Sequence, residues 1–220
     1  MALKTAQKMS DYVSQIKSSS VMIEVHMASN AGDIGAGFFV APRIVITCAH
    51  VLGITPQQPN PDIKSIVVNT TDGGRFYAQV VDYDLNMDVA IVYVNAPSQV
   101  NTYFLNLGNS GTIQEGEAVV SVGSPLGYKN TVSYGIVSNT NMAQDGQSDN
   151  YFLLDLRTNP GNSGGLIYSL EKQAVIGIAV AVLNSKNTDS QGISVGIAID
   201  PIKNLLKKNK IRFVYNEQGN

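Results

Sequence analysis

The heptapeptide NPGNSGG, residues 159–165, lies between two apolar runs, YFLLDL and LIYSL. Seven small or turn-forming residues between strand-like segments are typical of a tight turn. A plain turn, however, rarely needs three glycines around one hydroxyl, whereas a loop that presents a nucleophile and backbone N–H groups to a carbonyl does. The pattern therefore indicates Ser163 as a candidate nucleophile, with the N–H groups of Gly161 and Ser163 as candidate oxyanion donors.

A serine hydroxyl becomes a good nucleophile only when a base accepts its proton, and the chain holds two histidines. His26 alternates with Glu24 against apolar neighbours in VMIEVHM, so we expect it on the solvated face of a strand. His50 follows the apolar run RIVITC at the start of a turn, where a rigid element would hold a catalytic base. His50 is the candidate base, and a hydrogen-bonded core histidine is the alternative interpretation.

The other nitrogen of a catalytic imidazole needs a carboxylate to orient it. Asp88 opens the otherwise apolar run DVAIVYV, where a carboxylate is costly unless it is paired. The candidate catalytic residues then follow the chain order His50, Asp88, Ser163. The alternative interpretation is that Asp88 only ends the turn DYDLNMD. The turn DYDLNMD also imitates half a calcium loop, but Met87 and Tyr93 occupy its glycine and glutamate positions, so we expect no calcium there.

Short β-branched runs, separated by Gly, Asn, Asp and Pro, predict strands along the whole chain. They form two sets of six, divided by a loop-like segment at 95–111. The first set is expected near 21–27, 36–40, 43–47, 64–69, 75–82 and 89–94. The second is expected near 117–122, 131–138, 151–156, 165–169, 174–182 and 193–198. Many evenly spaced short strands favour barrels or sandwiches, and closure removes exposed edges.

Helices are expected only at the two ends of the chain, at residues 2–17 and 200–209. For the second helix, the sequence predicts Asp200 as N-cap and Pro201 at the first helical position. The basic run at 203–210 is then the solvated face of this helix.

Composition narrows the class of protein. The chain has 220 residues, of which 44% are hydrophobic and 15% charged, as in a compact globular protein of one or two domains. The net charge of −2 gives the chain no excess of positive charge with which to bind nucleic acid, so we expect no nucleic-acid partner. Cys48 is the single cysteine; it excludes an internal disulfide, fits a reducing compartment and is assigned to packing.

The first 20 residues carry scattered charges and no uninterrupted apolar core, and no other stretch is long enough to span a bilayer. We therefore expect no signal peptide, no membrane partner, and a cytoplasmic or otherwise non-secreted location, with the host or viral origin left open.

Three segments together resemble a known family. ITCAHV, NMDVAIV and TNPGNSGG look like the His, Asp and Ser boxes of trypsin-fold serine proteases, with the Deg/HtrA branch most similar. The resemblance extends over residues 18–207. It implies an all-β fold of two six-stranded antiparallel β-barrels with the catalytic cleft between them, in a single serine protease domain. The first barrel would span about 18–107, the second about 108–200, and a C-terminal helix about 200–210.

The resemblance also implies an activity. It points to a serine endopeptidase that acts on protein or peptide substrates through a His50–Asp88–Ser163 triad, an oxyanion hole of Gly161 and Ser163, and an acyl-enzyme intermediate, with no cofactor or metal. A non-hydrolytic chaperone-like binding module on the same barrels and a virus- or phage-encoded processing protease of narrow specificity are the alternatives.

Two departures from the family pattern bear on regulation. Asn162 replaces the aspartate of trypsin-like zymogens, so activation by a newly cut N-terminus is not expected. No PDZ domain follows residue 220, and we therefore expect no gating through one. Because family members reshape the loop at 160–163, it is expected in a competent or a collapsed state, distinguished by the direction of the Gly161 N–H.

The resemblance implies that the residue six before the nucleophile, here Arg157, lies at the base of the primary substrate pocket, followed by Thr158. A guanidinium there would favour an acidic or polar substrate side chain. Alternatively, Arg157 pairs with Asp155, two residues earlier on the same strand face, and the pocket is aliphatic. The apolar lining expected in that case is Ile178, Val180 and Ala198.

The Deg/HtrA branch commonly forms trimers through its N-terminal region, so the resemblance implies a homo-oligomer here. The predicted helix at 2–17 offers apolar residues at spacings of three and four. These residues are Met9, Tyr12, Val13 and Ile16. Such a face suits an interface between copies, and it equally suits docking on the helix's own barrel.

Overall fold

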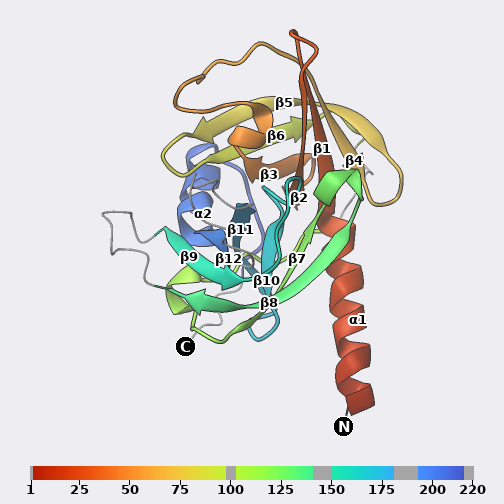
Figure 1. Cartoon of the computed structure of the whole chain (residues 1–220), viewed down its shortest axis with the longest axis vertical. Helices are drawn as coiled ribbons and strands as arrows, with labels where there is room; N and C mark the ends of the chain where they lie inside the picture. The colour runs from red at the N-terminus through yellow and green to blue at the C-terminus, as the bar shows by residue number, and fades with distance from the viewer. Residues whose placement is uncertain (1, 98–102, 141–149, 181–192, 216–220) are drawn as a thin grey trace.

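The computed structural model describes the backbone of residues 2–97, 103–140, 150–180 and 193–215, and side chains from residue 10 onwards. The strands in these ranges close into two six-stranded antiparallel barrels, one above the other in Figure 1. The predicted all-β fold with two sets of six strands is therefore confirmed.

The first barrel has the strand order β1-β2-β3-β6-β5-β4, and β4 pairs with β1 to close it. Because every strand has two neighbours, no backbone edge is left open for pairing with another chain. Its strands are β1 (Ser20–Met27), β2 (Gly32–Ala41), β3 (Ile44–Cys48), β4 (Ile63–Thr70), β5 (Arg75–Asp84) and β6 (Val89–Val94). Only β2 differs much from its predicted span, since it begins four residues earlier.

The second barrel has the strand order β10-β11-β12-β9-β8-β7, closed by pairing of β10 with β7. Its strands are β7 (Ala118–Gly123), β8 (Thr131–Asn139), β9 (Tyr151–Asp155), β10 (Leu166–Ser169), β11 (Ala174–Val180) and β12 (Ile193–Ala198). One hydrophobic cluster includes fully buried residues of both barrels, among them Phe38 and Ile91 from the first and Leu166 and Ile178 from the second. The two barrels therefore share part of their core.

Helix α2 (Ile199–Lys208) continues directly from β12, with Ala198 at the N-cap position. The prediction that Asp200 caps this helix, with Pro201 at its first position, is therefore wrong by two residues. Because the strand runs straight into the helix, the Asp200 carboxylate lies inside the first turn, where a negative charge is favourable. It accepts the backbone N–H groups of Ser110 (2.9 Å) and Gly111 (3.2 Å) instead.

The far end of α2 connects the two barrels. Its buried residues Ile202, Leu205 and Leu206 belong to the shared core. Just beyond them, Lys208 Nζ lies 3.0 Å from a carboxylate oxygen of Asp82 on β5, and Asn209 Nδ2 lies 2.8 Å from the same oxygen.

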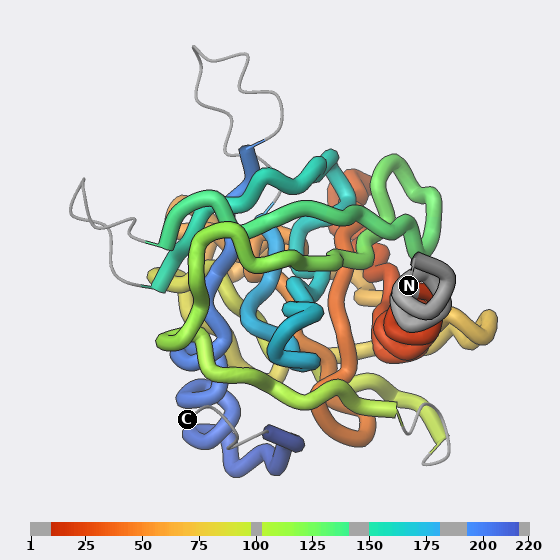
Figure 2. The backbone as a smooth tube through the Cα atoms, turned by 90° about the horizontal axis from the view of Figure 1, so that it is seen from below, coloured from red at the N-terminus to blue at the C-terminus, as the bar shows by residue number. Residues whose placement is uncertain are grey.

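Helix α1 (Ala2–Ser19) leads into β1 and extends away from the barrels in Figure 1; Figure 2 views it end-on at the side of the molecule. Ile16 is fully buried, and the Tyr12 ring lies 6.1 Å from that of Tyr168 on β10. The described part of the predicted apolar face thus docks on its own barrels; the Met9 side chain lies outside the described residues. The trimer stays a prediction. Within the described part of the chain, no helix is long and apolar enough to cross a membrane.

Candidate active site

Strand pairing brings the His50 and Asp88 segments together. Strand β3 ends at Cys48, and His50 opens the short 3-10 helix η1 (His50–Leu52). Asp88 immediately precedes β6, and the antiparallel register places Cys48 opposite Val89. The ends of two neighbouring strands therefore hold residues that are 38 positions apart in the sequence.

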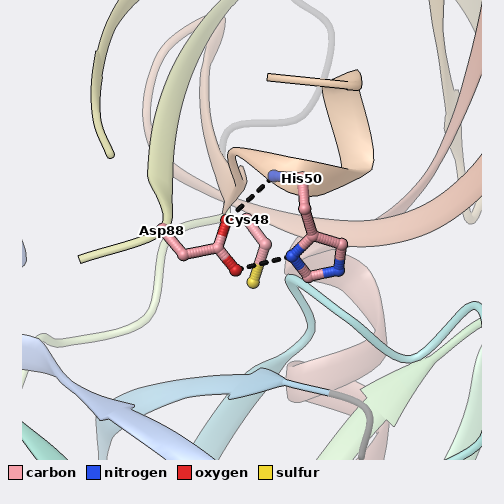
Figure 3. Close-up of side chains that lie close together, drawn as sticks. All are labelled: Cys48, His50 and Asp88. Atoms are coloured by element: carbon pink, nitrogen blue, oxygen red, sulfur yellow. Dashed lines mark hydrogen bonds and ion pairs between the residues drawn. The ribbon is translucent and has the colours of Figure 1, made fainter. Parts of the chain in front are cut away.

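Three contacts hold Asp88 against the segment that carries His50. Asp88 Oδ2 lies 2.5 Å from His50 Nδ1, and Oδ1 accepts the backbone N–H of His50 at 2.8 Å (Figure 3). The Asp88 carbonyl accepts the N–H of Ala49 at 3.1 Å. Asp88 has a φ of +56°, a left-handed conformation that aspartate tolerates better than most residues. The predicted pairing of the only carboxylate in DVAIVYV is thus observed.

The surroundings favour a charged His50. Burial lowers the pKa of His50, but the hydrogen bond and charge of Asp88, with the charge of Asp33, outweigh burial and raise it above 6.5. When the ring is neutral with its proton on Nδ1 facing Asp88, Nε2 is left as an acceptor. Asp33, at the start of β2, was not identified from the sequence, because no motif links it to His50.

The turn before Asp88 is organised from both barrels. Asp84 Oδ1 accepts the N–H groups of Asn86 (2.9 Å) and Met87 (3.1 Å). The hydroxyl of Tyr151, on β9 of the second barrel, donates to the Asn86 carbonyl at 2.8 Å. Sequence reasoning missed Tyr151, since a tyrosine in a strand carries no signal of a partner 65 residues away.

The backbone around Ser163 is bound to both barrels. The N–H of Ala36 on β2 donates to the Ser163 carbonyl at 2.8 Å, and the Gly164 N–H donates to the Ala179 carbonyl on β11 at 2.9 Å. Gly164 has a φ of +84°, and a Cβ there would lie 2.2 Å from the Ala36 carbonyl oxygen. Only glycine fits this close approach. It allows the loop that carries Ser163 to pack against β2 of the first barrel.

Gly161 is held by the turn that contains η3 (Pro125–Gly127). The Ser124 N–H donates to the Gly161 carbonyl, and the Leu126 N–H donates to the Pro160 carbonyl, each at 3.1 Å. Because the peptide between Pro160 and Gly161 is trans, the Gly161 N–H points away from Leu126. With φ +99°, a Cβ at Gly161 would lie 2.3 Å from the Ser124 carbonyl oxygen, so this position also requires glycine.

The predicted pocket residues fall into separate environments. Arg157 is exposed and lines a surface hollow of about 460 Å³ with Asp155 and residues 132–136. Within the described residues it forms no ion pair. Thr158 Oγ1 lies 2.7 Å from Ser194 Oγ. The apolar residues Ile178, Val180 and Ala198 are buried on the neighbouring strands β11 and β12.

The second histidine is placed as predicted. His26 is exposed, and its Nε2 lies 3.9 Å from a carboxylate oxygen of Glu24 on the same face of β1. Among the two histidines, His50 alone lies beside a strand-end carboxylate in the described structure.

Two closed antiparallel barrels, with a His–Asp pair at the end of one and a glycine-rich serine loop in the other, define the class of trypsin-fold proteins. The family model described as a trypsin-like peptidase domain matches residues 35–178, and the chain belongs to this family.

The curated relatives agree with the predicted Deg/HtrA likeness. A putative protease Do-like 14 from Arabidopsis thaliana is 30% identical over 191 residues, covering 84% of this chain and 43% of the relative. The mitochondrial serine protease HTRA2 of Drosophila grimshawi is 33% identical over 184 residues, covering 81% and 39%. The mitochondrial serine protease HTRA2 of Drosophila virilis is 34% identical over 185 residues, which cover 81% of this chain and 40% of the relative. The chain thus spans about two fifths of the length of these relatives.

Proposed function

We propose that this protein is a serine endopeptidase that hydrolyses peptide bonds through His50, Asp88 and Ser163. The observation that carries the proposal is the contact of 2.5 Å between His50 Nδ1 and Asp88 Oδ2, in a chain whose Ser163 lies in a glycine-rich loop bound to both barrels. Such an oriented imidazole has one nitrogen left to accept a proton.

The chemistry follows from these groups. The Ser163 hydroxyl attacks the substrate carbonyl while His50 Nε2 takes its proton, and Asp88 stabilises the imidazolium. The N–H groups of Gly161 and Ser163 stabilise the oxyanion. His50 then gives the proton to the leaving amine, which leaves an acyl-enzyme. A water, deprotonated by His50, attacks the ester, and release of the acid regenerates the Ser163 hydroxyl.

The loop geometry supports a competent oxyanion hole. The Pro160 carbonyl, which would fill the hole in a collapsed loop, accepts the Leu126 N–H instead. We therefore propose that the loop at 160–163 is in its competent state.

Proteins or peptides are the proposed substrates. A non-hydrolytic binding module would not need the Asp88 carboxylate to hold both the ring and the backbone N–H of His50. A processing protease of narrow specificity uses the same residues, and a diverse peptide library separates it from a general protease by the number of motifs cut.

The test is covalent labelling by a fluorophosphonate probe together with peptide hydrolysis. We expect wild-type protein and the control variant His26→Ala to be labelled, with the adduct on the peptide that contains Ser163. Ser163→Ala should lose the label and roughly five to six orders of magnitude in turnover. Hydrolysis that survives in Ser163→Ala, or an adduct elsewhere, would overturn the proposal.

A further inference from the structure

Cys48 lies beside the His50–Asp88 pair, and the proposed hydrolysis makes no use of it. Its side chain is fully buried at the end of β3. Its Sγ, a ring nitrogen of His50 and a carboxylate oxygen of Asp88 all lie within 4.8 Å of one another (Figure 3). A thiol, an imidazole and a carboxylate are three of the groups that bind Zn²⁺ in proteins.

We propose that Cys48, His50 and Asp88 form an inhibitory site for a thiophilic divalent cation such as Zn²⁺ or Cd²⁺, bound by Cys48 Sγ, His50 Nδ1 and Asp88 Oδ2. Binding stands on the geometry of the three side chains, whereas inhibition rests on the proposed function. A thiolate ligand selects such cations over Mg²⁺ or Ca²⁺, which prefer oxygen.

The three ligand atoms lie within 4.8 Å of one another and must move by about 1 Å to bind one cation. Ligand atoms at about 2.0–2.3 Å from a tetrahedral cation are about 3.4–3.7 Å apart. The contact between Nδ1 and Oδ2 must therefore open by about 1 Å, because it now measures 2.5 Å. Asp88 stays anchored as it does so, since its Oδ1 accepts the His50 N–H. The side chains of His50 and Asp88 are 36% and 30% exposed, which leaves access for the cation and for a water as fourth ligand.

The charges balance when the thiol loses its proton. Burial raises the pKa of Cys48 well above its ordinary value, the charge of Asp88 raises it further, and the Gly164 N–H opposes both, so the free protein holds a neutral thiol. The cation displaces that proton to solvent, and its two positive charges are matched by one thiolate and one carboxylate. In the free protein the thiol donates to the Ala179 carbonyl at 3.6 Å. When the thiol loses its proton, this carbonyl still accepts the Gly164 N–H and stays hydrogen-bonded.

Binding at Nδ1 would stop the proposed hydrolysis by changing the tautomer of His50. A cation on Nδ1 takes the lone pair there, so the single proton of the neutral ring moves to Nε2. Nε2 is then a donor and cannot accept the proton of Ser163. One cation per chain is therefore sufficient for inhibition, without any contact between the cation and the serine.

The test is titration of metal-free protein with Cd²⁺, followed by the ultraviolet thiolate-to-cadmium absorbance and by equilibrium dialysis. Because Cys48 is the only cysteine, any such absorbance reports this residue. Wild type, Ser163→Ala and the control His26→Ala should each show the band and bind one cation per chain. Cys48→Ala and Cys48→Ser should lack the band and bind at least tenfold more weakly, with folding checked by circular dichroism.

Inhibition is measured as hydrolysis relative to each variant's own metal-free rate. Half-inhibition by Zn²⁺ should need at least tenfold more cation in the two Cys48 variants than in wild type or His26→Ala. Absence of the band from wild type, or equal inhibition with and without Cys48, would overturn the inference. If the band forms but metal-free protein hydrolyses nothing, the cation site stands and the proposed function fails.

Discussion

Both carboxylate oxygens of Asp88 contact His50. Oδ2 lies 2.5 Å from the ring nitrogen Nδ1, and Oδ1 accepts the backbone N–H at 2.8 Å. The ring and the backbone of His50 are thus held by the same side chain. The pairing of β3 with β6 places Asp88 beside His50, and Tyr151 of the second barrel binds the turn that precedes Asp88. The position of the serine relative to His50 depends on contacts between barrels.

The proposed base should titrate above its ordinary pKa. We expect kcat/KM to rise with pH as His50 loses its proton, with a midpoint above 6.5, because Asp88 and Asp33 raise the pKa of His50 against the effect of burial. Asp88→Asn removes the larger of these two influences and leaves burial, so the midpoint should fall, and the maximal rate should drop by about four orders of magnitude. The pH–rate profile measures both effects.

Asp33→Asn is the matched control for this experiment. It removes a charge near His50 but no hydrogen bond to the ring, so the midpoint should fall by less, with the maximal rate nearly unchanged. A midpoint that stays in place in Asp88→Asn would show that another group controls the acidic limb.

The oxyanion loop should tolerate no side chain at Gly161. Gly161→Ala adds a Cβ 2.3 Å from the Ser124 carbonyl oxygen at a φ of +99°, so the loop must move. We expect kcat to fall by about 10²–10³, the cost of losing one oxyanion donor. Gly116→Ala is the control, since Gly116 also has a positive φ (+82°) but nothing within 4 Å of a Cβ. Equal losses in the two variants would mean that backbone strain, rather than the loop position, sets the effect.

Tyr151 should affect both stability and turnover. Tyr151→Phe removes the hydrogen bond to Asn86 between the barrels, which should cost about 1 kcal/mol of the free energy of unfolding and lower kcat/KM by about tenfold. Tyr83→Phe removes a similar bond, to Pro59 within the first barrel, and should leave kcat/KM unchanged. Urea unfolding and steady-state kinetics on both variants separate the two effects. Unchanged kinetics in Tyr151→Phe would rule out a positioning role.

The buried carboxylate of Glu117 should be the costliest ion-pair partner to remove. Its side chain is 1% exposed, accepts hydrogen bonds from Ser169 Oγ and the Gln114 N–H, and lies 3.2 Å from Lys172 Nζ. Glu117→Ala should therefore lower the free energy of unfolding by about 3–5 kcal/mol. Arg75→Ala breaks an ion pair in which the Arg75 side chain is 62% exposed, and should cost less than about 1 kcal/mol. Urea denaturation measures the free energy of unfolding of both variants. Similar losses in Glu117→Ala and Arg75→Ala would contradict the prediction.

Substrate selection should not depend on Arg157. Because this side chain is exposed beside β8, and the apolar pocket candidates are buried on β11 and β12, we predict cleavage after aliphatic residues. Profiling of wild type and Arg157→Ala on a peptide library should then give the same preference within about twofold. A preference for acidic residues that disappears in the variant would instead place the guanidinium in the pocket.

The sequence by itself determined the strands and the candidate chemistry. Apolar alternation, turn residues and glycine spacing are local signals, so twelve strands, the polar setting of His26 and the pairing of His50 with Asp88 could all be predicted from short stretches. The boundary of α2 could not, because β12 runs into the helix without a capping residue and Asp200 finds its partners at Ser110 and Gly111, about 90 residues away.

Tertiary structure alone decided which further side chains lie near the His50–Asp88 pair. The charge of Asp33 raises the pKa of His50, and the Tyr151 hydroxyl binds the turn before Asp88 across the two barrels. Cys48 was assigned to packing from the sequence, and it is buried; its sulfur nevertheless lies beside the His50–Asp88 pair because the register of β3 with β6 places it there. Such contacts arise from the pairing of strands far apart in the chain, and no local pattern of residues encodes them.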